Sequence, residues 1–111
     1  AASDVYKRQV EVRDGGTRSW SIDPGRYGLA CDDPAELAGG GPAENARLVR
    51  EVLGGEGPAG ARAAVVLNAA AAVYVAGMVP DYGAAVEVAR AGMGRGAGLQ
   101  ALERLRGAYS A

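Results

Sequence analysis

The longest apolar run in the chain is LNAAAAVYVAG, from Leu67 to Gly77, with Asn68 as its one fully polar side chain. The charge-free stretch around it, Ala63 to Val79, lies at the lower limit of length for crossing a bilayer. Alanine and glycine dominate it, and both contribute little to membrane insertion. The pattern therefore predicts a buried helix over about residues 60–78 that lets neighbours approach closely. Asn68 is expected to be buried and hydrogen-bonded to neighbouring backbone, with a ligand contact as the alternative.

Period-two alternation marks the other end of the chain. In VEVRDGGTRSWSI, Val10 to Ile22, apolar and polar residues alternate on both sides of Asp14 to Gly16, which tolerate the positive φ that tight turns need. This pattern predicts a β-hairpin, with Trp20 anchoring it to a core. An isolated hairpin is marginal in water, so it needs a larger sheet or helices to lie on.

Three further helices are predicted by apolar residues at helical spacing. They begin near Pro42, after a capping Asp81, and near Leu99. The positions expected to face a core are Ala46, Leu48, Val49, Val52 and Leu53 in the first helix, Val86, Ala89 and Met93 in the second, and Leu99, Leu102 and Leu105 in the third. The predicted fold class is α/β: a β-hairpin followed by about four helices. No second strand region offers the hairpin a sheet, which indicates part of a larger domain.

Composition and charge exclude several kinds of functional site. The chain has 111 residues, enough for one domain or part of one, and its net charge of −1 argues against nucleic acid as a partner. A single cysteine, Cys31, excludes an internal disulfide. Because the chain has no histidine, it cannot by itself form a Cys/His zinc site, a Ser-His-Asp triad or a Cys-His dyad. No signal-peptide pattern is seen, so a cytoplasmic location is expected.

The first nine residues, AASDVYKRQ, have no initiator methionine and no clear periodicity. They resemble a translated adaptor or linker scar, so residues 1–9 are predicted to be non-native and the native chain to begin near Val10. A frayed native N-terminus is the alternative.

Three segments could carry chemistry, and each has a simpler interpretation. Gly39 to Gly41 precede a helix and could bind phosphate, but a linker with a helix start is favoured because no P-loop lysine follows. GMGRGAG, Gly92 to Gly98, follows a helix rather than a strand, which favours a helix break over a dinucleotide site. Asp32 and Asp33 could help to hold Mg²⁺, but before Pro34 they are typical turn or cap residues. We assign no catalytic, cofactor-binding or metal-binding residue.

Four pieces in order resemble one enzyme family, the anthranilate phosphoribosyltransferases of glycosyltransferase family 3. VEVRDGGTRSWSIDPGRYGL is similar to the family's strand pair and its DP…(F/Y)GL turn. GGGPAENARLVREVLGG and LNAAAAVYVAG are similar to its Gly-Gly turn, ENA helix start and alanine-rich helix. VEVARAGMGRGAGLQALERL resembles the family's C-terminus. The resemblance covers about Val10 to the end.

The resemblance implies that residues 10–111 are the C-terminal portion of the family's α/β domain. It implies transfer of phosphoribose from phosphoribosyl pyrophosphate to anthranilate in tryptophan biosynthesis, with Mg²⁺, by a homodimer formed through an N-terminal helical domain. The family's GTGGD loop, KHGN segment and Asp-Glu metal pair have no matching stretch here. The 111 residues are therefore expected to be inactive alone.

Other interpretations stay open from the residues. One is a non-catalytic, nucleic-acid-binding paralogue of the same fold, which the near-neutral charge disfavours. Another is a pyrimidine nucleoside phosphorylase-like protein, which shares the architecture. The last is a small interaction module.

Overall fold

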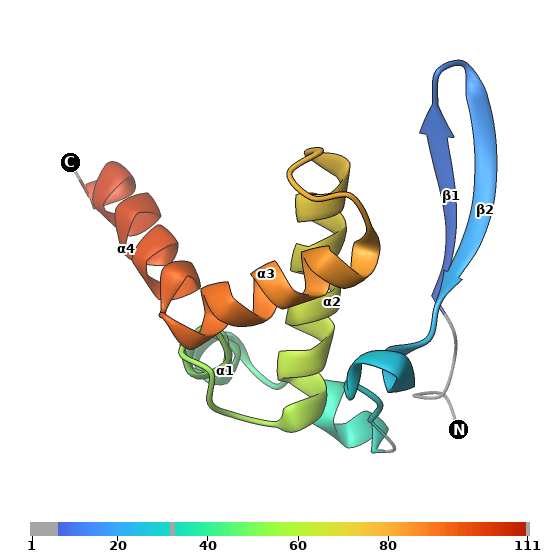
Figure 1. The fold of residues 1–111 in the computed structure, drawn as a ribbon. Helices are drawn as coiled ribbons and strands as arrows, with labels where there is room; N and C mark the ends of the chain where they lie inside the picture. Colours follow the sequence, from blue (N-terminus) through green and yellow to red (C-terminus); the bar gives the residue numbers. More distant parts are fainter. Residues whose placement is uncertain (1–6, 32, 111) are drawn as a thin grey trace.

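An antiparallel hairpin and four α-helices make up the part of the chain that the computed structural model describes, residues 7–31 and 33–110 (Figure 1). The elements are β1 (Lys7–Arg13), β2 (Gly16–Ile22), short 3-10 helices at Pro24–Tyr27 and Pro34–Leu37, α1 (Pro42–Leu53), α2 (Ala59–Val75), α3 (Tyr82–Gly94) and α4 (Ala97–Ser110). This confirms the predicted α/β class. Of the nine residues interpreted as foreign, the first six lie outside the described residues and the other three are paired in β1.

A two-residue turn connects the strands. Asp14 and Gly15 have φ values of 51° and 77°, as a tight hairpin turn requires at both central positions. The flanking pair is Arg13 with Gly16, and the same register places Glu11 opposite Arg18. The turn predicted at Asp14–Gly16 is therefore confirmed.

The two faces of the hairpin have unequal surroundings. Ile22, at the end of β2, is 2% exposed and belongs to the core, whereas Val10 and Val12 on the opposite face are 62% and 75% exposed. Within the described residues, no third strand pairs with either strand. The hairpin is therefore anchored at one end and leaves an apolar face in water.

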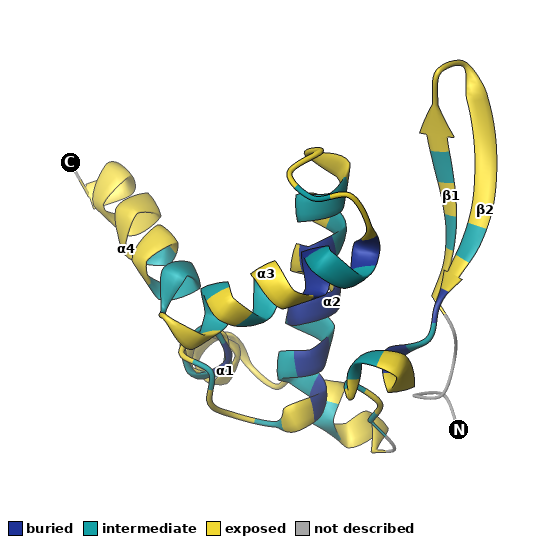
Figure 2. Cartoon of the chain, in the orientation of Figure 1, coloured by how far each residue is buried: buried dark blue, intermediate teal, exposed yellow. Residues whose placement is uncertain are grey.

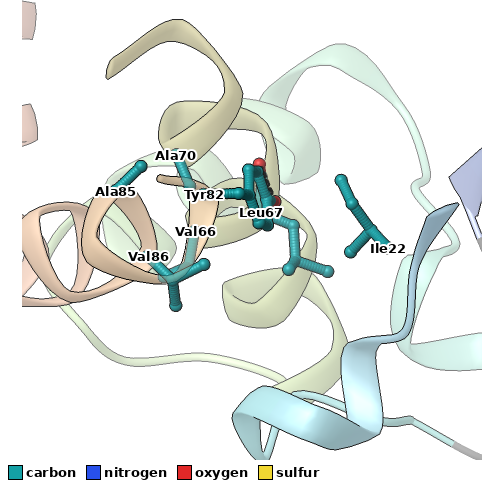
Figure 3. Close-up of a cluster of buried hydrophobic side chains, with 7 residues drawn as sticks. All are labelled: Ile22, Val66, Leu67, Ala70, Tyr82, Ala85 and Val86. Atoms are coloured by element: carbon teal, nitrogen blue, oxygen red, sulfur yellow. Dashed lines mark hydrogen bonds between the residues drawn. The ribbon is translucent and has the colours of Figure 1, made fainter. Parts of the chain in front are cut away.

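The core lies where α2 and α3 cross, next to the base of the hairpin (Figure 3). The alanines Ala70 and Ala85 have no exposed surface and let the two helices approach closely, and Val86 fills the space beside them. The buried cluster consists of Ile22, Val66, Leu67, Ala70, Tyr82, Ala85 and Val86. The Tyr82 hydroxyl donates a hydrogen bond of 2.8 Å to the carbonyl of Leu67, which joins the start of α3 to the middle of α2.

The alanine-rich run does form a helix, but the prediction that the helix is buried holds for one face only (Figure 2). Ala69, Ala72 and Val75 are exposed, because the described elements cover only the opposite side of α2. The prediction that Asn68 is buried is wrong, because its side chain is exposed, but the expected hydrogen bond to backbone is present: Asn68 donates to the Ala64 carbonyl of its own helix at 2.8 Å. None of the described helices is long and apolar enough to cross a membrane.

The apolar stripes predicted on the outer helices are also less buried than expected. In α1 only Val52 is buried, while Val49 is 48% exposed. No residue of α4 is buried, and Leu105 of its predicted stripe is 56% exposed. The reason is visible in Figure 1, where α4 extends away from the other helices after its first turns. By contrast, Val86 in α3 is fully buried, as predicted.

The chain is more open than an intact domain of its size. Its accessible surface is 7165 Å², whereas a folded monomer of this mass exposes about 5,700 Å². Its radius of gyration is 15.3 Å, against about 13 Å for a compact chain of this length. The difference is consistent with faces of α1, α2 and α4 that pack on nothing in the described part.

Candidate functional site

The glycine-rich segment before α1 is a helix start. The amide of Gly40 donates to Asn45 Oδ1 at 2.8 Å, and Asn45 Nδ2 donates back to the Gly40 carbonyl at 2.9 Å. The Glu44 carboxylate lies so close that an added Cβ at Gly40 would collide with its Oε2. A phosphate here would compete with Asn45 for a donor and face a negative charge. The interpretation favoured from sequence is therefore supported.

The second glycine-rich segment is a helix break, as expected. Gly92 and Gly94 belong to α3, and Gly96, with φ of 76°, reverses the chain before α4. Gly98 then packs against α1, where an added Cβ would lie 2.9 Å from Leu53 Cδ2. These glycines serve turning and close packing, and none follows a strand.

Of the two acidic residues considered for Mg²⁺, Asp33 is described and serves as a helix cap. Asp33 caps the 3-10 helix Pro34–Leu37, because its Oδ1 accepts from the Ala35 amide at 2.9 Å. Asp32 lies outside the described residues. Among the residues that are described, no three histidine, cysteine or acidic side chains come together to hold a metal ion. The donors that Mg²⁺ prefers are thus not assembled by this part of the chain.

Cys31 takes part in a small cluster that ties the loop before α1 to the start of α2. Its thiol donates to Glu36 Oε2 at 2.9 Å, and the same oxygen accepts from the Gly60 amide at 2.7 Å. The hydrogen bond to Glu36 raises the pKa of Cys31, and the bonds from Cys31 and Gly60 lower the pKa of Glu36. An added Cβ at Gly60 would lie 2.6 Å from the Cys31 sulfur and 2.7 Å from Glu36 Oε2. The absence of a side chain at position 60 therefore allows the loop to approach the start of α2 this closely.

Aromatic rings join the hairpin to the helices. Trp20 packs edge-to-face against Tyr74 of α2 and Tyr82 of α3, with ring centroids 5.6 and 5.4 Å apart, and Tyr27 meets Tyr82 at 5.7 Å. The prediction that Trp20 anchors the hairpin to the core is confirmed. The aromatic partners were not identified from the sequence, because they come from three separate elements.

A charged network lies beside these rings. Glu11 Oε1 accepts from the Tyr74 hydroxyl at 2.8 Å and from Arg18 Nη2 at 2.8 Å, and Glu11 Oε2 is 3.3 Å from Arg13 Nε. The hydrogen bond from Tyr74 and then the one from Arg18 hold the pKa of Glu11 below its ordinary value. The network fixes the hairpin's orientation against α2.

A cavity lies where the segment after Tyr27, the start of α2 and the end of α3 meet. It has a volume of about 370 Å³ and is lined by two arginines, Arg62 and Arg90. Two further grooves, of about 300 and 270 Å³, share Leu53 and Val65 and have mostly apolar walls. The sequence pattern did not single out either arginine as a candidate for binding.

Comparison with known proteins points to one protein family. Residues 4–99 match a family described as "Glycosyl transferase family, a/b domain". The chain is 44% identical over 95 residues to the anthranilate phosphoribosyltransferase of Rubrobacter xylanophilus, covering 86% of this chain and 28% of that protein. It is 44% identical over 96 residues to anthranilate phosphoribosyltransferase 2 of Streptomyces coelicolor, with the same two shares. It is 44% identical over 110 residues to the Thermomicrobium roseum protein of that name, covering 96% of this chain and 30% of the relative. The chain thus spans less than a third of the length of these curated relatives.

Proposed function

The chain belongs to the glycosyl transferase family whose α/β domain it matches over residues 4–99, and we propose that it is the C-terminal part of an anthranilate phosphoribosyltransferase. The whole enzyme would transfer phosphoribose from phosphoribosyl pyrophosphate to anthranilate, in tryptophan biosynthesis. The observation that carries this proposal is the 44% identity, over most of the chain, to relatives with that name.

The open architecture supports assignment to a larger domain. The hairpin pairs with no further strand in the described part, and Val75 on α2 and Leu105 on α4 are exposed. The elements that would cover the hairpin, α2 and α4 would belong to the rest of the α/β domain. The near-neutral charge gives no support to the nucleic-acid-binding alternative.

We assign the chemistry to residues outside this chain. Phosphoryl and pyrophosphate groups need cationic or metal-bound positions, and the reaction needs the amine held close to the ribose carbon. The described residues assemble no metal site, and Asp33 is committed to a helix cap. The chain contributes packing to the domain, and the proposal places the Mg²⁺ ligands and both substrate sites in the rest of the enzyme.

The same proposal includes two expectations carried over from the family resemblance. The complete enzyme would be a homodimer formed through an N-terminal helical domain, and it would be cytoplasmic. Sedimentation of the complete protein measures the first, and fractionation of the source cells measures the second.

A hybrid enzyme tests the function. In this hybrid, the segment of the Rubrobacter xylanophilus enzyme that this chain matches is replaced by residues 10–111. We expect the hybrid to restore growth without tryptophan to cells that lack anthranilate phosphoribosyltransferase, and to form phosphoribosylanthranilate with Mg²⁺ in a fluorescence assay that follows anthranilate consumption.

Two controls separate packing from chemistry. The relative's enzyme without the matched segment should be inactive, and so should the isolated 111-residue chain. Mg²⁺-dependent turnover by the isolated chain would contradict the assignment of the chemistry to other residues. A hybrid that is folded, binds both substrates and yet has no activity would contradict the proposed function itself.

A further inference from the structure

The cavity of about 370 Å³ combines two positive charges with apolar walls. Arg62 comes from the first turns of α2 and Arg90 from the last turns of α3, while Leu29, Val66 and Met93 supply the apolar part of the lining. No aspartate or glutamate is among the described residues that line it. Its volume is at the lower end of the range for small-molecule sites.

Arg62 has hydrogen-bonding capacity that the described residues do not use. Its Nε is buried and has no partner in the described part of the chain, and its Nη1 makes only a long contact of 3.4 Å to the Gly55 carbonyl. The charge of Arg62 helps to lower the pKa of the nearby Glu36 carboxylate, which already accepts a hydrogen bond from the Gly60 amide. A buried N–H group without an acceptor is costly, and the remaining N–H groups of the half-buried Arg62 are available to an anionic ligand.

Arg90 is held at the other side of the cavity by two protein contacts. Its Nη2 donates to the carbonyl of Tyr27, and its Nε lies 3.6 Å from Glu87 Oε1. Its side chain is 37% exposed, and Arg90 has more N–H groups than these two contacts use. A pre-positioned guanidinium loses less entropy when it binds an oxyanion.

We propose that this cavity binds a small organic acid, whose carboxylate or phosphate group is held by Arg62 and Arg90 and whose compact apolar part contacts Leu29, Val66 and Met93. The site is made of this chain's own residues and is separate from the substrate sites that the proposed function assigns elsewhere. It would be a regulatory or accessory site of the complete enzyme.

The first test uses the hybrid enzyme at low ionic strength, where charge pairing is least screened. The side-chain Nε–Hε signals of Arg62 and Arg90 are followed by NMR during titration with 3-methylbutanoate, acetate, inorganic phosphate and the neutral 3-methylbutanamide. We expect both signals to shift with 3-methylbutanoate, to shift less at equal concentration of acetate, and not to shift with the amide. Phosphate distinguishes a site that needs only the oxyanion from one that needs the apolar part as well.

Matched variants assign the effect to the two arginines. Arg62→Gln and Arg90→Gln should each weaken 3-methylbutanoate binding at least about tenfold, the loss expected for a charge-assisted hydrogen bond. Arg104→Gln removes the same charge from an exposed position of α4 and should leave affinity unchanged. Equal weakening in all three variants would overturn the proposal, because it would show only general charge attraction.

The hybrid enzyme also provides a second measurement. The rise in its thermal inactivation temperature with 3-methylbutanoate is compared among the Arg62→Gln, Arg90→Gln and Arg104→Gln variants, so any contribution of the substrate sites is common to all. Loss of the rise in the first two variants only supports the cavity. An unchanged rise in all variants refutes it, and neither result depends on whether the hybrid has transferase activity.

Discussion

The isolated chain is predicted to lack a cooperative tertiary structure, and joining it to the rest of the enzyme should restore one. It exposes 7165 Å², about 1,500 Å² more than a compact monomer of its mass. That excess is similar to the total area buried in a standard protein–protein interface. In the hybrid, we expect most of this surface to be covered.

The core that remains is small. Three of the nine buried apolar residues are alanines, and Val86 is the one side chain larger than alanine among them with no exposed surface. Alanine buries little apolar area, so the hydrophobic contribution to folding is modest for 111 residues. Helices with native-like content but loosely packed side chains are the expected outcome.

Four measurements on the isolated chain check this expectation. Far-UV circular dichroism should show helix, while near-UV signals from Trp20 and its tyrosine neighbours should be weak, and a hydrophobic dye should bind. A calorimetric scan should show no sharp transition. A single transition with an enthalpy of about 60–80 kcal/mol, as for an intact domain of about 100 residues, would refute the reasoning.

Three substitutions in the hybrid enzyme test the junction between the hairpin and the helices. Ile22→Ala should cost about 2–5 kcal/mol in a urea titration because it empties a core position; a loss below about 0.5 kcal/mol, the usual size for a surface substitution, would contradict its place in the core. Because the folded state holds the pKa of Glu11 below 4.5, its stabilising effect is present at neutral pH and is lost as pH falls through the folded-state pKa. Glu11→Gln should therefore accelerate hydrogen exchange of the hairpin amides at pH 7, while Glu103→Gln on α4 should not. Tyr82→Phe removes one buried hydrogen bond and should cost about 1 kcal/mol of stability. Because burial raises the pKa of Tyr82 from 10.0 to about 12, the parent hybrid should lose stability as pH rises from 10 to 12, and the Tyr82→Phe variant should lack this loss.

Element positions follow from local chemistry, and the sequence was sufficient for them. Pro42 starts α1, the Asp81 side chain caps α3 at 2.8 Å from the Ala84 amide, and Asp14 begins the hairpin turn. Each signal acts within four residues, so it depends little on what surrounds it.

Burial could not be predicted in the same way, because it depends on neighbours that the pattern does not identify. Leu105 has the spacing of a core residue and is 56% exposed, and Asn68 lies in the most apolar run and is also exposed. The periodicity reports which face could be covered, and it does not report whether the covering element is present in the chain.

The contacts around the hairpin are of two kinds: some follow from local strand register, and others depend on how distant elements pack. The ion pair between Glu11 and Arg18 follows from strand register once the turn is known, so the sequence could have predicted it. Its link to Tyr74, which lies 63 residues away, requires the packing of α2 against the hairpin. The two arginines of the cavity belong to this second class, since α2 and α3 bring them together only on folding.

The close contacts of Gly60 with Cys31 and Glu36 at the start of α2 restrict which substitutions relatives can accept at these positions. A Cβ at position 60 would lie within 3.0 Å of the Cys31 sulfur and the Glu36 side chain, so a substitution there requires at least one of these neighbours to shift. Shortening position 36 first removes one obstacle but also removes the acceptor of the Gly60 amide. Drift at these three positions must therefore proceed in concert, and an aligned set of relatives should show them covarying, with glycine at position 60 wherever an acidic residue stands at position 36.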